Sequence, residues 1–334
     1  MLLADLPPIE TWHWLAFGGL VVFLLGLDLL VLHREDHVPS MRESAGYTVF
    51  WILLAVGFNG FVWWWRGGEA GLQFLAGYLL EKALSMDNVF VFAVIFRYFC
   101  VPLQYQYRVL FWGILVAIFT RLAFILAGAA LIAKFHIVIP LFGIFLVYTA
   151  YKLARESGAE VHPERNVVRR FARKFLPLTK EGSEKYGHSF FVRVRGRLYV
   201  TPLFLVLLVV ESTDVLFAVD SVPAIFGVTK DPFIVFSSNI FAILGLRALY
   251  FMLAGAITMF RYLHYGLAAI LGFVGLKMIA EYAADTFFGH EGEGLVPIWM
   301  SLVVIAVLLA ISIGASMAAN RRERAAAVEE GGKG

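Results

Sequence analysis

Nine charged side chains lie inside segments that are otherwise strongly apolar. The acids are Glu81, Asp87, Glu211, Asp214 and Asp220, and the bases are Lys82, Arg121, Arg247 and Lys277. A charged group at mid-membrane costs about 2.5–3.5 kcal/mol on an insertion scale. Left unpaired, such a set would cost on the order of 25 kcal/mol, more than the stability of a typical fold. These side chains must therefore face the interior of a helix bundle and pair with one another, with water or with a ligand.

Helical spacing groups the polar residues of the first acidic segment. At about 100° per residue, Glu81, Ser85 and Asn88 lie on one face of a helix. Asp87 falls well off that face in an ideal helix. The spacing therefore predicts a polar stripe of one carboxylate, one hydroxyl and one amide.

A second stripe is predicted around Glu211. Glu211 and Asp214 are three residues apart on one helix face, and Ser221 continues the same stripe. Asp220 falls off it. Because Pro223 removes a backbone hydrogen bond and clashes with the preceding turn, we predict that the helix breaks there and turns Asp220 inward.

The chemistry of these groups favours a hard divalent cation. Carboxylate, hydroxyl and amide oxygens, with Asn59 and Asn239 as further neutral donors, suit Mn²⁺, Mg²⁺ or Ca²⁺. No histidine lies deep in an apolar segment, which argues against Zn²⁺ or Cu, and the acids outnumber the bases, which argues against an anion. The metal is expected as a transported substrate, with no permanent cofactor.

Two alternatives need no transported ion. The charges can form an internal salt-bridge network in which Arg121 and Arg247 clamp the acids. The chain would then be a membrane scaffold or a partner subunit that transports nothing. Catalysis is not expected, because Asp87 and Asp214 lack the sequence context of an intramembrane aspartyl protease.

The composition sets the class of protein. Of 334 residues, 60% are hydrophobic and 16% charged, against about 25% charged in a typical soluble chain. Mean hydropathy is +0.77, and the 31 Phe and 8 Trp residues suit lipid and its interface. Cys100 is the single cysteine. These values indicate an all-α polytopic membrane protein and exclude a disordered chain, a disulfide scaffold and a nucleic-acid binder.

Hydropathy predicts nine transmembrane helices within a domain at residues 1–318. They lie near 12–32, 46–65, 72–96, 108–133, 138–152, 200–226, 233–256, 264–282 and 296–318.

The distribution of basic residues predicts the orientation. With the N-terminus outside and the C-terminus in the cytoplasm, 21 of the 28 Lys and Arg residues face the cytoplasm and three face outward. The protein is accordingly placed in the inner (plasma) membrane. Its cytoplasmic loop 153–199 is basic; Val167–Phe175 is predicted to be a surface helix near anionic lipid, and Phe190–Thr201 a β-hairpin. Residues 319–334 form a cytoplasmic tail.

Two parts of the sequence resemble each other. The segment that begins at Glu81 and closes on Ile95-Phe96 aligns without gaps with the segment that begins at Glu211 and closes on Ile225-Phe226. The stretches after Arg121 and Arg247 also align. This predicts a 3+3 inverted repeat: spans 3–5 (about 72–152) would repeat as spans 6–8 (about 200–282), with the other helices peripheral. Such repeats are common in secondary transporters, which bind substrate where the repeats meet.

Four longer motifs resemble the TerC family of integral membrane proteins, in particular its Alx-type members. They are Glu81-Lys-Ala-Leu-Ser-Met-Asp-Asn88, Glu211-Ser-Thr-Asp214 with Phe217-Ala-Val-Asp220-Ser-Val-Pro-Ala224, the stretch Ser237–Phe251, and Leu27–Arg34. The likeness extends over roughly residues 10–318. It implies Mn²⁺ efflux, with some members linked to tellurite resistance or an alkaline-pH response. The alternative of a non-transporting scaffold or partner subunit would then act in tellurite or envelope stress resistance.

The family resemblance also implies the ion-binding residues. The implied metal ligands are Glu81, Asp87, Asn88, Glu211, Asp214 and Asp220. Ser85, Ser221, Asn239, Arg121 and Arg247 are expected to support them, the two arginines by holding the acids when the ion is absent. The expected partners are the metal ion and the lipid bilayer, with no nucleic acid.

Overall fold

A computed structural model describes most of the chain. The described residues are 9–28, 40–155, 172, 176–179, 187, 189–194, 196–254, 262–288 and 295–331, with backbone alone for 322–331. Most of the predicted surface helix Val167–Phe175 lies outside these residues.

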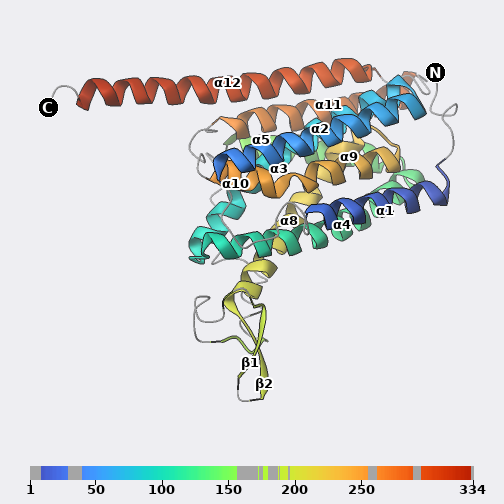
Figure 1. Ribbon diagram of the computed structural model, residues 1–334. Helices are drawn as coiled ribbons and strands as arrows, with labels where there is room; N and C mark the ends of the chain where they lie inside the picture. Colours follow the sequence, from blue (N-terminus) through green and yellow to red (C-terminus); the bar gives the residue numbers. More distant parts are fainter. Residues whose placement is uncertain are drawn as a thin grey trace.

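The described part of the chain contains ten helices and one hairpin (Figure 1). The elements are α1 (Thr11–Leu27), α2 (Met41–Arg66), α3 (Gly68–Tyr98), α4 (Leu103–Lys134), α5 (Val138–Arg155), β1 (Phe191–Val194), β2 (Arg197–Val200), α8 (Pro202–Phe226), α9 (Pro232–Leu244), α10 (Leu246–Ala254), α11 (Leu263–Phe288) and α12 (Ile298–Gly331).

The all-α membrane fold is confirmed, whereas the count of nine spans is met only in part. Within the described residues six helices are long and apolar enough to cross a membrane, and α9 with α10 makes a seventh if the bent pair is one span. The other two predicted spans correspond to α1 and α3. The described part of α1 has only 17 residues. α3 has 31, but Glu81, Lys82 and Asp87 occupy its middle.

α3 is the central helix of the bundle, which explains how it tolerates these charges. Most side chains from Ala70 to Phe96 are buried, so the helix needs no continuous apolar surface. It packs against α2, α8, α9 and α12, while α4 packs on α8 and α5 on α11. Figure 1 shows the helices gathered in one bundle, with the β1–β2 hairpin projecting beside the start of α8 and α12 lying along one edge.

The predicted seventh span is not continuous. α9 ends at Leu244 with Gly245 as its C-cap, and α10 begins at Leu246, with a bend of 40° between the two helices. A side chain at Gly245 would be crowded, because a Cβ there would lie 3.0 Å from Lys82 Nζ and 3.1 Å from Trp51 Cβ. Lys82 Nζ donates to the carbonyl of Ala242 (3.3 Å), one of the carbonyls that the end of α9 leaves without a helical partner.

The predicted helix break at Pro223 is wrong. α8 continues through Pro223 to Phe226, so the proline lies in the last turn of the helix. Asp220 instead accepts a hydrogen bond from another helix, since Thr149 Oγ1 on α5 donates to its Oδ1 over 3.2 Å.

The end of the bundle where α8 and α9 meet is held by polar contacts. Asp231 caps α9 by accepting from the N–H groups of Phe233 (2.9 Å) and Ile234 (3.3 Å), and it also forms an ion pair with Arg66 of α2. Thr229 Oγ1 donates to Gln73 Oε1 (2.6 Å). These contacts tie α2 and α3 to the α8–α9 connection.

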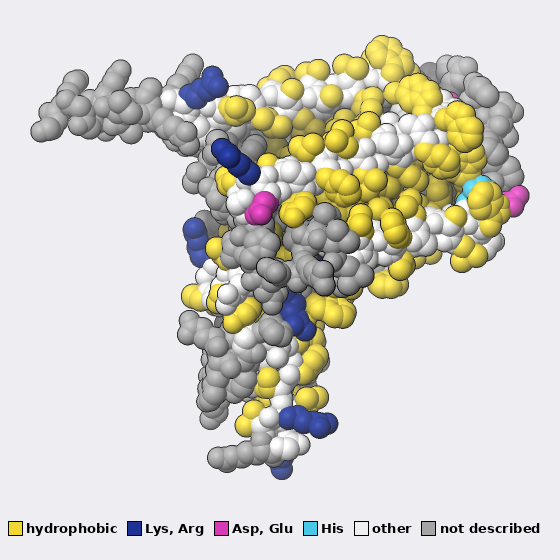
Figure 2. Space-filling view, in the orientation of Figure 1, with side chains coloured by type: hydrophobic (Ala, Val, Ile, Leu, Met, Phe, Trp, Pro, Cys, Tyr) yellow, Lys and Arg dark blue, Asp and Glu magenta, His cyan; other side chains and the backbone are white. Residues whose placement is uncertain are grey.

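The surface of the bundle is suited to lipid. Figure 2 shows hydrophobic side chains covering the visible face of the helices, with Lys and Arg at one end of the bundle and on the hairpin. Exposed Trp12, Trp64 and Trp299 lie near helix ends, where interfacial tryptophans are common. β1 and β2 pair antiparallel, with Phe191 opposite Val200, in the segment where the sequence predicts a hairpin.

Candidate functional site

Glu81 and Arg121 form an ion pair in the centre of the bundle. Glu81 lies in the middle of α3 and Arg121 on α4; both are buried, and Arg121 Nη1 donates to Glu81 Oε1. Arg121 Nη2 lies 3.7 Å from Asp214 Oδ1 on α8. One guanidinium thus stands between two carboxylates from different helices. When all three groups are ionised, the cluster carries one net negative charge.

Ser221 and Asn239 complete this cluster. Arg121 Nη1 also donates to Ser221 Oγ (2.9 Å) and to Asn239 Oδ1 (3.3 Å), while Asn239 Nδ2 donates to Glu81 Oε2 (3.2 Å). Both carboxylate oxygens of Glu81 therefore have donors. The structure brings together five of the predicted site residues from α3, α4, α8 and α9.

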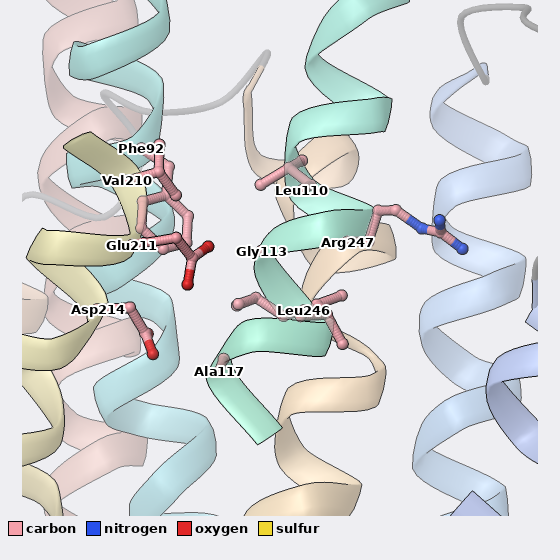
Figure 3. Close-up of a pocket in the computed structure, with 10 residues that line it drawn as sticks. Phe92, Leu110, Gly113, Ala117, Val210, Glu211, Asp214, Leu246 and Arg247 are labelled. Carbon is pink, nitrogen blue, oxygen red and sulfur yellow. The ribbon is translucent and has the colours of Figure 1, made fainter. Parts of the chain in front are cut away.

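Glu211 lies in a different environment. It lines a cavity of about 20 Å³, enough for one water-sized occupant. Glu211 Oε1 and Asp214 Oδ2 are buried and have no hydrogen-bond partner among the described residues. Figure 3 shows both carboxylates pointing from α8 toward α4 near Gly113 and Ala117. Buried oxygens without donors beside a small cavity are suited to a cation, a proton or an ordered water.

Gly113 forms the wall that faces Glu211. A Cβ at this position would lie 2.9 Å from Glu211 Oε1, closer than such atoms normally approach. Sequence reasoning missed Gly113, because a lone glycine in an apolar helix has no chemical signature. Extending the alignment of Arg121 with Arg247 backward by eight residues would have found it, since it places Gly113 opposite Asn239.

Arg247 does not take the predicted role of holding the acids of α3 and α8. It forms a buried ion pair with Asp28, at the end of α1, and its guanidinium lies 4.2 Å from the centre of the Tyr107 ring. Figure 3 shows the side chain leaving the cavity in the direction away from Glu211 and Asp214. Arg247 is still among the residues that line the cavity. The two arginines that align in sequence therefore have different partners.

The remaining predicted ligands, and the supporting residue Ser85, make none of the hydrogen bonds or ion pairs of the Arg121 cluster. Asp220 contacts Thr149 and is partly buried. Ser85 Oγ is buried without a partner among the described residues. Asn88 is buried on α3, and Asp87 beside it is partly buried. The structure therefore does not gather all six implied ligands at one point.

The geometry holds one cation, and in this conformation that cation is the Arg121 guanidinium. Among the residues that the structure describes, no three His, Cys, Asp or Glu side chains converge to hold a metal ion. Arg121 fills the space between Glu81 and Asp214. A metal ion can use these same oxygens only when the guanidinium moves away, because two cations in one buried site repel each other strongly.

Comparison with known proteins identifies the family. Residues 66–324 match the integral membrane protein TerC family. The chain belongs to the TerC family. It is 49% identical over 308 residues to an uncharacterized membrane protein of Myxococcus xanthus, covering 92% of each chain.

Other relatives carry a functional description. The chain is 44% identical to the Alx protein of Salmonella typhi, over 90% of this chain and 92% of that one. It is 45% identical to Alx of Escherichia coli strain K12, over 80% and 85%. Both are described as candidate membrane-bound redox modulators. No solved structure matches the chain. The family and the helices together establish a multi-pass membrane protein.

Proposed function

We propose that this protein exports a divalent cation, Mn²⁺, across the inner membrane, with buried carboxylates as the transient ligands. The observation that carries this proposal is the Glu81–Arg121–Asp214 cluster beside the cavity at Glu211. A structural ion pair needs no neighbouring cavity with unpaired carboxylate oxygens. A transported cation needs both, since it must enter next to the acids and displace the group that neutralises them.

The oxygen donors support the choice of ion. Glu81, Asp214 and Glu211 supply carboxylates, and Ser221 and Asn239 supply neutral oxygens within the same region. Such a set suits Mn²⁺, Mg²⁺ and Ca²⁺ alike. The family resemblance favours Mn²⁺ among them. It also adds Asp87, Asn88 and Asp220, which would act at other stages of transport, since they lie apart here.

Arg121 gives the transport cycle a physical basis. In the conformation described, its guanidinium pairs with Glu81 and Asp214 and offsets one of their two negative charges, so Arg121 occupies the position that the ion would take. Loading requires Arg121 to withdraw, and release requires it to return, which makes ion and guanidinium competitors for the same oxygens. Protonation of an acid would assist release, which would couple export to protons.

The packing supports the inverted repeat. In the proposed repeat, α3, α4 and α5 correspond to α8, α9–α10 and α11. The packing of α4 on α8 then has its counterpart in the packing of α9 on α3. The packing of α5 on α11 is its own counterpart. Asn239 contacts Glu81 just as its counterpart Gly113 faces Glu211. Rocking of one repeat against the other would give alternating access. The distribution of Lys and Arg supports nine spans with the N-terminus outside.

Metal flux in proteoliposomes tests the proposal. Purified protein is reconstituted with a divalent-sensitive dye, and Mn²⁺, Mg²⁺, Ca²⁺ and Zn²⁺ are compared with and without a pH gradient. We expect Mn²⁺ flux that Glu81→Gln and Asp214→Asn abolish. Glu69→Gln is the matched control, because Glu69 lies on α3 three turns from Glu81 and outside the cluster. Flux that survives both site substitutions would refute the proposed site.

A scaffold that transports nothing is the competing function, and a charge swap separates the two. Glu81→Arg combined with Arg121→Glu preserves an internal ion pair, so a scaffold should keep its fold and partners. A coordination site should lose flux, because the carboxylate then stands on α4. The description of relatives as redox modulators is compatible with transport. Since one cysteine cannot cycle an internal disulfide, a redox effect would act through the ion that is moved.

A further inference from the structure

One face of α4 forms a continuous buried stripe through the bundle. Its members lie within about 40° of Arg121 on the helix, at 100° per residue. They are Ile114, Ala117, Arg121, Ile125, Gly128 and Ile132, and all are buried. From Gly113 to Ile132 the helix rises about 28 Å, close to the thickness of about 30 Å of a bilayer core. α8 packs along this face, so the α4–α8 seam extends nearly across the membrane.

Two cavities lie along this seam, one on each side of Arg121. The small one, about 20 Å³, borders Gly113, Ala117 and Glu211. The large one, about 710 Å³, lies at the other end of α4 and α8 and is bordered by Ala129, Ile132, Phe226, Lys230, Tyr282 and Asp285. The small cavity takes one water-sized occupant, whereas the large one is wide enough for a hydrated ion.

Two obstacles separate the cavities. The first is Arg121 itself, bound to Glu81 and Ser221. The second is the ring of Phe226, which is buried against Gly128. A Cβ at Gly128 would lie 2.7 Å from Phe226 Cε2. The ring therefore occupies the space that a side chain at position 128 would need. Ile125, fully buried, lies between the two obstacles on α4.

We propose that the α4–α8 seam is the path of the transported cation and that Phe226, seated on Gly128, is the barrier between the large cavity and Arg121. The path rests on the proposed transport function. The large cavity is the vestibule on the side where α4 and α8 end, which is the external side in the predicted orientation. Phe226 closes the path by excluding water, since an apolar constriction cannot solvate a passing ion.

Cysteine accessibility tests this path independently of the cargo. The chain has one cysteine, so Cys100→Ser provides a background without thiols. Ala129→Cys reports on the vestibule and Ile125→Cys on the space behind Phe226. A membrane-impermeant cationic methanethiosulfonate is added to spheroplasts or to inside-out vesicles, and the labelling rate is measured.

We expect Ala129→Cys to react from the external side and Ile125→Cys to remain unreactive. In the presence of Phe226→Ala, the external labelling of Ile125→Cys should rise by roughly tenfold, as about 1.4 kcal/mol of easier access would give. Phe226→Leu, which keeps an apolar side chain, should leave it unreactive. Gly128→Ala should also increase labelling, because it displaces the ring without removing it; this second variant serves if Phe226→Ala does not fold.

Phe74→Ala is the matched control, since Phe74 is equally buried on α3 but borders neither cavity. The barrier is refuted if Phe74→Ala exposes Ile125→Cys as strongly as Phe226→Ala does. It is also refuted if Ile125→Cys reacts with Phe226 in place, or stays unreactive in both Phe226→Ala and Gly128→Ala. If the cysteines label as expected but the protein moves no metal ion, the proposed cargo is refuted and the path itself still stands. Metal flux without the expected labelling would refute the path alone.

Discussion

Glu81 and Glu211 stand at aligned positions of two related segments, yet their surroundings differ. Glu81 accepts hydrogen bonds at both carboxylate oxygens, from Arg121 and Asn239. Glu211 has one oxygen without a partner in the described structure and faces a small cavity. The difference arises on the neighbouring helices, because Asn239 faces one acid and Gly113 the other. Two carboxylates at aligned positions can therefore differ, because the residue opposite Glu81 donates a hydrogen bond to it and the residue opposite Glu211 has no side chain that could do so.

The two aligned arginines repeat this contrast. Arg121 holds acids from α3 and α8, whereas Arg247 pairs with Asp28 at the end of α1, outside the two aligned segments. A helix outside these segments thus removes one arginine from the centre. If the aligned segments were equivalent in their contacts, Arg247 would stand next to Glu211. The proposed transport cycle would account for this asymmetry, since alternating access requires the two proposed repeats to differ in their contacts.

The largest effect on this comparison is expected from Arg121→Met. Removing the guanidinium leaves Glu81 and Asp214 buried without their shared cation, which should lower the free energy of unfolding by about 3–5 kcal/mol. Denaturant unfolding in detergent, followed by tryptophan fluorescence, measures it. Combining Arg121→Met with Glu81→Gln should recover part of the loss, because one buried charge is removed. A double variant as unstable as the sum of both singles would contradict the ion pair.

A second prediction separates the two glutamates directly. Glu81→Gln loses charged hydrogen bonds with Arg121 and should destabilise the protein by about 2–3 kcal/mol. Glu211→Gln should change stability by less than about 1 kcal/mol, because the unpaired oxygen has no protein contact to lose. Both should abolish metal flux. Equal destabilisation by the two substitutions would show that their environments are equivalent after all.

Gly113→Ala should close the cavity that distinguishes Glu211. The added methyl group would lie 2.9 Å from Glu211 Oε1. We expect metal flux to fall roughly tenfold, as a penalty near 1.4 kcal/mol on ion binding would produce. Gly57→Ala on α2 is the matched control, because a Cβ added at Gly57 would have no atom within 4 Å. If both variants transport equally well, the cavity is not part of the ion's route.

An effect smaller than that of Arg121→Met or Glu81→Gln is expected from Asn239→Ala. Glu81 loses one neutral donor while keeping Arg121, which should cost about 1–2 kcal/mol of unfolding free energy. Ser237→Ala is the control on the same helix, since Ser237 is equally buried but bonds only to the backbone carbonyl of Ile234. Thermal unfolding of the purified variants measures the difference. A loss no greater than that of Ser237→Ala would indicate that Asn239 does not hold Glu81.

Some features of the site could be predicted from residue types alone. Most described helices begin and end close to the predicted spans, and α5 begins at Val138 as expected. α12 is the exception, since it continues to Gly331, 13 residues beyond the predicted end of its span at 318. The burial of Glu81, Arg121 and Asp214 follows from the cost of exposing a charge to lipid. Asn239 and Ser221 were also predicted as supporting groups. These predictions succeed because the bilayer imposes the same length and polarity constraints on every span.

Other features could not be predicted, because they depend on which helix lies beside which. Asp28 as the partner of Arg247, the pairing of Arg66 with Asp231, and Gly113 opposite Glu211 all join residues far apart in the chain. The break at Gly245 rather than at Pro223 is of the same kind, since Lys82 and Trp51 crowd that glycine from other helices.

The sequence by itself determined that this is a helical membrane protein of the TerC family with acids and arginines in its interior. Composition and the cost of charge in lipid leave no other arrangement for such a chain. The tertiary structure alone decided which acid is neutralised and which keeps an open oxygen. That choice depends on side-chain reach and on single-residue differences between packed helices, and neither is visible in hydrophobic periodicity.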